Sequence, residues 1–106
     1  MAWFYLFTAG LLEIVWAYSM KRSAGFTLPV PTGVTIVTMI ASFALLSVAM
    51  RTLPLGTAYT VWTGIGAVGA FAVGVVVLGE AVTPMRLAAA ALIVGGIVLM
   101  KLSSAA

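Results

Sequence analysis

Glu13 is the only acidic residue that lies inside a long apolar segment of this 106-residue chain. It stands near the middle of residues 2–20, where a carboxylate costs about 2.5 to 3.5 kcal/mol on membrane-insertion scales. At helical spacing Gly10 lies one turn before Glu13, and the indole of Trp16 lies one turn after it on the same face. A charge in hydrocarbon, with room on one side and an aromatic wall on the other, is a candidate binding site.

A second interpretation of Glu13 is a buried acid that is neutral because it is protonated or held by an internal partner. No Lys, Arg or His lies within any of the uncharged runs to be that partner. Because ionisable residues inside membrane spans usually have a function, we take Glu13 as the predicted site and keep the alternative open.

The composition is that of a membrane protein, with 64% hydrophobic and only 7% charged residues. The chain has no cysteine, histidine or aspartate, which removes disulfides, zinc sites, thiol nucleophiles and the usual general base. The second acid, Glu80, falls in a predicted loop. We therefore expect a protein that is not an enzyme and that needs neither a metal ion nor a cofactor.

The basic residues are scattered along the chain and form no stripe. They are Lys21, Arg22, Arg51, Arg86 and Lys101. This spacing is typical of the flanks of membrane spans, where long basic side chains reach the head groups of the lipid bilayer. It does not favour a nucleic-acid partner.

Apolar runs between helix breakers predict an all-α membrane protein with four transmembrane helices, forming one domain over residues 1–106. We expect spans near residues 2–20, 32–50, 55–78 and 84–101, each long enough to cross a bilayer. Pro29 and Pro31 interrupt the first connection, so Thr32 is expected to cap the second helix. Thr83 is the expected cap of the fourth helix.

Among the polar and aromatic residues of the second and third apolar runs, Ser42, Tyr59 and Trp62 are the candidates for the site. Ser42 falls near mid-membrane, where a hydroxyl commonly bonds the carbonyl of its own helix one turn back. Tyr59 and Trp62 are three residues apart and share a helix face. Aromatic side chains in a span often contact lipid or head groups, and this interpretation stays open, above all for Tyr59.

The third predicted helix contains a run of glycines, Gly64, Gly66 and Gly69. Their spacing matches the G-x-G-x-x-G pattern of dinucleotide-binding proteins, but no strand precedes them and the segment is of membrane length. Glycines let neighbouring backbones approach closely and weaken a helix. We therefore expect a packing surface and a point of bending or gating.

Four helices are too few to enclose a solvated path and also to cover it from lipid, so we expect a homodimer. Ala89 and Gly96, small residues seven apart in the fourth apolar run, are the expected contact between the two copies. Two basic residues flank one side of the spans and three the other, which gives almost no orientation bias. Insertion in both orientations would make the dimer antiparallel, with halves related as inverted repeats are.

Residues 54–67, PLGTAYTVWTGIGA, together with Glu13 and the four-span length, resemble the small multidrug resistance family. The resemblance covers essentially the whole chain. At Trp16 and Ser42 the chain resembles the guanidinium exporter subtype of the family. Multidrug pumps of the family tend to carry a small residue where Trp16 stands. Ala89 departs from the glycine that family members often have there, and alanine is small enough to serve.

The resemblance implies an antiparallel, dual-topology homodimer, multi-pass in the inner membrane, that exports guanidinium in exchange for protons. It implies that Glu13 of both subunits forms one shared site for the proton and the substrate. Trp16, Ser42, Tyr59 and Trp62 carry over as the residues around that site.

The residue types fit such a substrate independently. Guanidinium is planar, permanently charged and rich in N–H donors, so a carboxylate binds it through two hydrogen bonds and an indole stacks on its face. Ser42 and Tyr59 are expected to hydrogen-bond Glu13 and to fix its rotamer. Burial in hydrocarbon disfavours the ionised acid, so a proton competes with the cation, as an antiporter requires.

Two other functions use the same features. A quaternary-ammonium or multidrug exporter of the same family would use the same acid and aromatic residues, and only Trp16 and Ser42 separate it from a guanidinium exporter. A membrane scaffold that transports nothing would tolerate leucine in place of Glu13.

Overall fold

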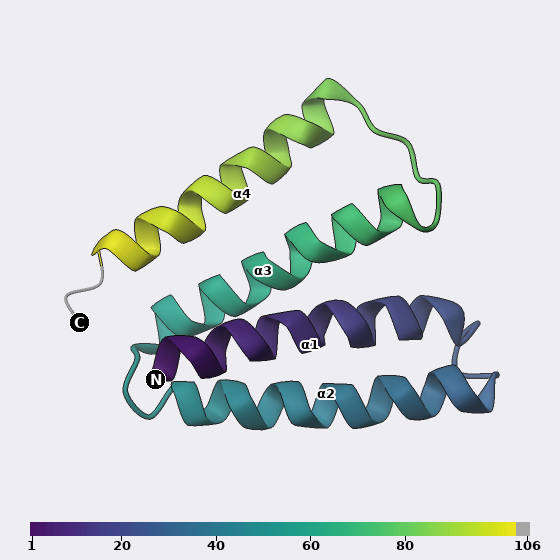
Figure 1. Cartoon of the computed structure of the whole chain (residues 1–106), viewed down its shortest axis with the longest axis horizontal. Coiled ribbons are helices and arrows are strands. Elements are labelled where there is room, and N and C mark those ends of the chain that lie inside the picture. Colours follow the sequence, from purple (N-terminus) through teal and green to yellow (C-terminus); the bar gives the residue numbers. More distant parts are fainter. Residues whose placement is uncertain (104–106) are drawn as a thin grey trace.

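The computed structural model describes residues 1–103, and the regular structure in that part of the chain is α-helical. The helices are α1 (Ala2–Arg22), α2 (Pro29–Ala49), α3 (Leu55–Val76) and α4 (Pro84–Ser103) (Figure 1). The predicted all-α class with four helices is therefore confirmed.

Helices of this length follow from long apolar runs between helix breakers. Each has 20 to 22 residues, or about 30 Å, which matches the hydrocarbon thickness of a bilayer. By length and composition α2, α3 and α4 can cross a membrane, as expected of a multi-pass membrane protein. α1 is equally long but contains Glu13 and ends on Lys21 and Arg22.

The start of α2 differs from the sequence-based expectation, because the helix begins three residues earlier, at Pro29. Pro29 and Pro31 both fit in the first turn, since a proline there lacks only an N–H that would have no helical partner. Thr32 therefore lies inside the helix, where its hydroxyl donates to the Leu28 carbonyl at 2.6 Å. The predicted cap at Thr32 was wrong.

The other helix ends lie close to the predicted ones. Thr83 caps α4, because its Oγ1 accepts the backbone N–H of Arg86 at 3.1 Å. α3 ends at Val76, two residues before the predicted end, and α4 continues to Ser103, two residues beyond it. Ends of helices commonly fray over such distances.

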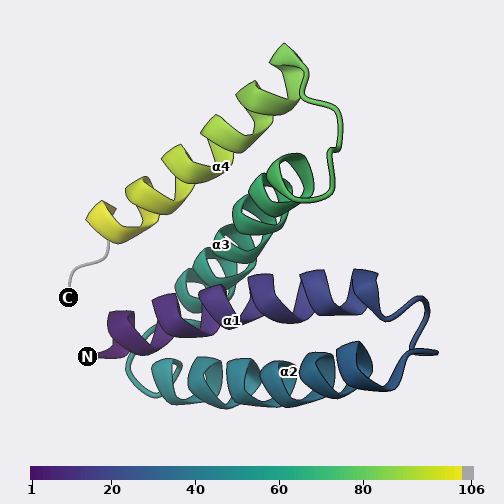
Figure 2. The same ribbon diagram turned by 45° about the vertical axis from the view of Figure 1, so that its right-hand side comes forward.

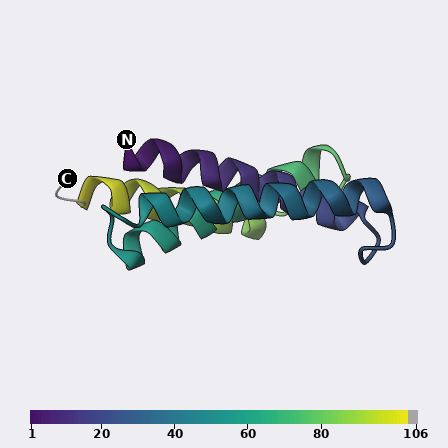
Figure 3. The same cartoon turned by 90° about the horizontal axis from the view of Figure 1, so that it is seen from below.

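α1 lies between α2 and α3, and helices that follow one another in the chain run antiparallel (Figures 1 and 2). α4 packs along α3, and at its last turn Lys101 Nζ lies 4.7 Å from the centroid of the Trp3 ring of α1. None of the described residues of α4 is buried. Seen from below, the chain is a thin slab whose shortest extent is 16 Å (Figure 3). A helix with its side chains is about 10 to 12 Å wide, so one chain does not surround an enclosed path.

The buried apolar core occupies the end of the slab near the α2–α3 turn. It joins the first half of α1 to the last turns of α2 and the first turns of α3. Its members are Leu6, Ala9, Leu46, Ala49, Leu53, Ala58, Val61 and Trp62. This core fixes how α1 and α3 meet, and thereby positions the residues in the middle of α1 against α3.

Candidate functional site

The Glu13 side chain lies between α1 and α3, with its carboxyl group directly against the backbone of Gly66. A β-carbon at residue 66 would overlap that carboxyl group, so any larger residue there would displace the Glu13 side chain. Oxygen Oε1 of Glu13 is buried and has no hydrogen-bond partner among residues 1–103. The described part of the chain therefore supplies no internal base that holds this oxygen, which argues against the alternative of a permanently paired acid.

Close contacts between α1 and α3 occur on both sides of the carboxyl group. Before it, Gly10 faces Ile65, and a β-carbon at Gly10 would lie 2.7 Å from Ile65 Cγ2. After it, the Ile14 side chain occupies the space where a β-carbon of Gly69 would be. Gly10 and Gly69 thus allow the two helices to approach closely, as small residues do in membrane helix pairs.

The glycines of α3 act in the structure as contact positions. Gly64 faces α4, where a β-carbon would lie 2.9 Å from Ile97 Cδ1, while Gly66 and Gly69 face α1. The packing role expected from the sequence is thus present for all three residues. α3 is one uninterrupted helix over Leu55–Val76, and a role of these glycines in bending or gating stays a prediction.

Ser42 connects three helices through its hydroxyl group. Ser42 Oγ donates to the Ala9 carbonyl of α1 at 2.7 Å and accepts the indole N–H of Trp62 of α3 at 3.0 Å, and both bonds are buried. A mid-span hydroxyl was equally expected to bond its own helix, and that interpretation was wrong. The expected bond from Ser42 to Glu13 is not formed either, because the single hydroxyl proton is directed to Ala9.

Four aromatic rings form a continuous row across α1, α2 and α3. The ring centroids of Trp16 and Phe43 are 6.3 Å apart, and those of Phe43 and Trp62 are 5.7 Å apart. The Tyr59 ring follows at 5.7 Å from Trp62. The row unites three aromatic residues that were predicted from the sequence for the site.

Phe43 is the member of the row that the sequence did not indicate. It bridges Trp16 to Trp62, although its only sequence signal is its position next to Ser42. Trp62 is buried, so it is not a lipid-facing residue within the chain, whereas Tyr59 is 54% exposed. A location at the edge of the site, or against lipid, thus remains open for Tyr59.

The arrangement can bind a small organic cation. A carboxyl oxygen without a partner accepts N–H donors, and indole and phenyl faces attract cations through the ring quadrupole. Trp16 adds a buried indole N–H that also has no partner among residues 1–103. Within the described residues no cluster of three or more His, Cys, Asp or Glu side chains is placed to bind a metal ion.

Ala89 and Gly96 lie on α4, away from Glu13. Both are exposed, and a β-carbon at Gly96 would have nothing within 4 Å. Gly96 lines a groove of about 560 Å³ between α3 and α4, which Tyr59 also lines. The two residues are accessible for a contact between copies, and that contact stays a prediction.

Comparison with known proteins places this geometry in a family context. The family described as "Small Multidrug Resistance protein" matches residues 1–93. Proteins named "Guanidinium exporter" from Escherichia coli strain K12 and from Citrobacter freundii are each 57% identical over 104 residues, which cover 98% of this chain and 99% of each relative. The protein of the same name from Salmonella typhimurium matches equally well.

Proposed function

The chain belongs to the small multidrug resistance family, and from this premise we propose that it exports guanidinium and small guanidinyl cations in exchange for protons. The observation that carries the proposal is the Glu13 carboxyl group, set between α1 and α3 with one buried oxygen that has no partner among residues 1–103. A buried acceptor without a partner is costly, so this oxygen favours the binding of a proton or of a cation.

Exchange follows from the use of one group for both ligands. Guanidinium carries N–H donors in one plane and binds a carboxylate through two parallel hydrogen bonds. A proton on Glu13 removes the negative charge, and the cation then loses its main partner. If the protein alternates between inward-facing and outward-facing states only when Glu13 is occupied, export of the cation requires import of protons.

Ser42 and Trp62 favour a small, flat substrate over a bulky one. The hydrogen bond from Trp62 to Ser42 holds the indole in one orientation, so the Trp62 ring is a preformed wall within the aromatic row. A planar cation stacks on such a wall without rearrangement, whereas large multidrug cations need side chains that repack. This supports the guanidinium subtype over the quaternary-ammonium alternative.

The working unit in this proposal is an antiparallel, dual-topology homodimer in the inner membrane. In each chain α1 crosses the membrane in addition to α2, α3 and α4. The 16 Å slab is too thin to enclose a path, and α4 has no buried residue, so a second copy has an accessible helix to pack on. Ala89 and Gly96 are the proposed contacts.

The test replaces Glu13 by glutamine in protein reconstituted into vesicles. An imposed guanidinium gradient should drive proton flux in the wild type, and Glu13→Gln should abolish it, because the amide neither titrates nor carries charge. Arg51→Gln, at the α2–α3 turn, is a control that changes one charge far from Glu13. Coupled flux that persists in Glu13→Gln at the wild-type rate contradicts the proposal.

A comparison of substrates separates the two exporter subtypes. The same vesicles are given guanidinium or tetraphenylphosphonium at equal concentration, and proton flux is measured for each. We expect flux with guanidinium only. Flux with tetraphenylphosphonium alone would instead favour the multidrug subtype.

A further inference from the structure

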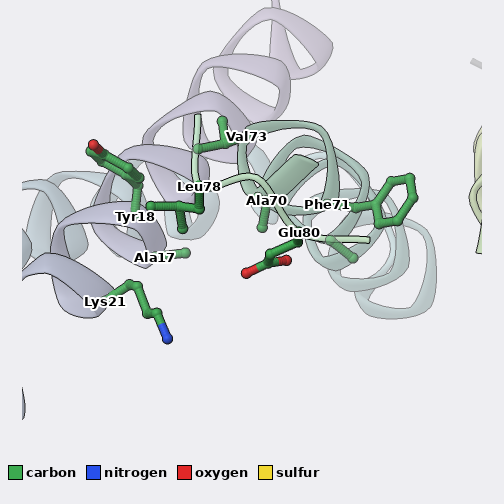
Figure 4. A pocket seen from close by; sticks show the side chains of 10 residues that line it. Ala17, Tyr18, Lys21, Ala70, Phe71, Val73, Leu78 and Glu80 are labelled. Carbon is green, nitrogen blue, oxygen red and sulfur yellow. The ribbon is translucent and has the colours of Figure 1, made fainter. Parts of the chain in front are cut away.

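A cavity of about 370 Å³ lies between α1, α3 and the α3–α4 connection (Figure 4). At its inner end are Ala17, one helical turn after Glu13, and Ala67, next to the Gly66 on which the Glu13 carboxyl group lies. At its outer end are Lys21 of α1 and Glu80 of the connection. The cavity thus extends from the end of the slab toward the Glu13 site.

Glu80 is held at this outer end by the backbone of α3. Its N–H donates to the Gly74 carbonyl at 3.0 Å, and a β-carbon at Gly74 would overlap its carboxyl group. Gly79, with φ at +71°, allows the chain to turn back at this point. The sequence predicted a solvated loop acid, and Glu80 is exposed in the α3–α4 connection. The structure adds that its carboxyl group lies over α3 at the rim of a cavity.

The side chains of Glu13 and Glu80 have one contact in common, although Glu80 is exposed and one oxygen of Glu13 is buried. Each lies against a glycine of α3, Glu13 on Gly66 and Glu80 on Gly74. Eight residues of helix separate these glycines, or about 12 Å along the axis. A cation that enters the cavity meets Glu80 at its opening, and Ala17 and Ala67 at its inner end adjoin the Glu13 site.

The charged group that faces Glu80 from α1 is Lys21, and Figure 4 shows the two side chains at the same opening. Arg22 is directed to the Tyr18 ring instead, with its guanidinium carbon 6.0 Å from the ring centroid. An amine at the opening repels a cation, while a carboxylate there attracts it. Lys21 and Glu80 should therefore act in opposite directions on the capture of a cation.

We propose that Glu80 is an outer binding site for the guanidinium cation, which it holds at the cavity opening before transfer to Glu13. The inference rests on the proposed function and adds a second cation-binding residue to it. Glu80 contributes to capture and not to exchange, because the proton and the cation compete only at Glu13. In an antiparallel dimer one such opening faces each side of the membrane, so capture is assisted from both sides.

The test measures the KM for guanidinium in vesicles at low and at high ionic strength. Loss of one exposed charge at contact distance weakens binding about fivefold, so Glu80→Gln should raise KM about fivefold at low salt, with unchanged proton coupling. Salt screens exposed charges, so the increase should shrink in 0.5 M salt. Lys21→Gln should lower KM, and Arg51→Gln, at the far end of the slab, should leave it unchanged.

A further variant tests the position of the carboxyl group and not only its charge. Gly74→Ala keeps Glu80 but displaces it from α3, and KM should rise as it does for Glu80→Gln. Size-exclusion chromatography of each variant verifies that it is folded. If Glu80→Gln and Lys21→Gln both have the same KM as the wild type at low salt, the outer site is overturned and the proposed function stays intact. Absence of guanidinium-driven proton flux in the wild type would overturn both.

Discussion

Replacing Ser42 by alanine removes the atom that connects α1, α2 and α3 near the aromatic row. Ser42 Oγ is bound at 2.7 Å to the Ala9 carbonyl and at 3.0 Å to Trp62 Nε1. Alanine leaves the Trp62 N–H without a partner in a buried region, whereas the Ala9 carbonyl keeps its hydrogen bond within α1. The Trp62 ring then has no bond that fixes its orientation against Phe43.

The expected cost follows from these two bonds. A hydrogen bond between membrane helices contributes about 0.6 kcal/mol on average and up to about 1.7 kcal/mol, and a buried donor without a partner costs about 1 to 3 kcal/mol. Ser42→Ala should therefore lower the free energy of unfolding by about 2 kcal/mol. Ser47→Ala, on an exposed position of the same helix, should change it by less than about 0.5 kcal/mol.

A double-mutant cycle tests whether the Trp62 N–H is the cause. Trp62→Phe removes the donor, so Ser42→Ala in that background leaves one orphaned group fewer. The loss in free energy of unfolding in the double variant should be about 1 kcal/mol smaller than the sum of the losses in the two single variants. Unfolding by SDS in mixed micelles, followed by circular dichroism, measures all four proteins. Strictly additive effects, or equal costs for Ser42→Ala and Ser47→Ala, would refute this account of Ser42.

Two further substitutions test the site and the assembly. Gly66→Ala should reduce guanidinium-driven proton flux about tenfold or more, because the new methyl group displaces the Glu13 carboxyl group. The control is Gly33→Ala, where a β-carbon meets nothing within 4 Å and transport should be normal. Equal flux in both variants would contradict a role for the contact between Gly66 and Glu13. Gly96→Leu should convert the proposed dimer to a monomer in size-exclusion chromatography, since a large side chain separates closely packed helices, whereas Gly95→Leu should not. A stable Gly96→Leu dimer would place the interface elsewhere.

The helices of this protein could be predicted because they depend on local properties of the chain. Long apolar runs, helix breakers and the cap at Thr83 are visible in the sequence, and each acts within a few residues. The start of α2 was missed for a local reason as well. Pro29 and Pro31 were taken as breakers, although a proline in the first helical turn loses no hydrogen bond.

The residue types of the candidate site could also be recognised in part. A lone acid in an apolar run is costly, which singles out Glu13 without any structure. Phe43 could not be recognised, because an aromatic residue in an apolar helix has many possible neighbours. Glu80 was correctly predicted as an exposed loop acid. Its position over Gly74 could not be predicted, because the turn at Gly79 that brings it there depends on contact with α3.

The sequence by itself determined four long helices, one carboxyl group within an apolar run and the glycines that let helices approach. Tertiary structure alone decided that Gly66 is where Glu13 rests, that Ser42 bonds Ala9 and Trp62, and that Glu80 lies at the opening of a cavity. The physical reason is that helix formation depends on neighbours in the chain. Contacts between helices depend instead on their rotation and offset, which many weak interactions set together.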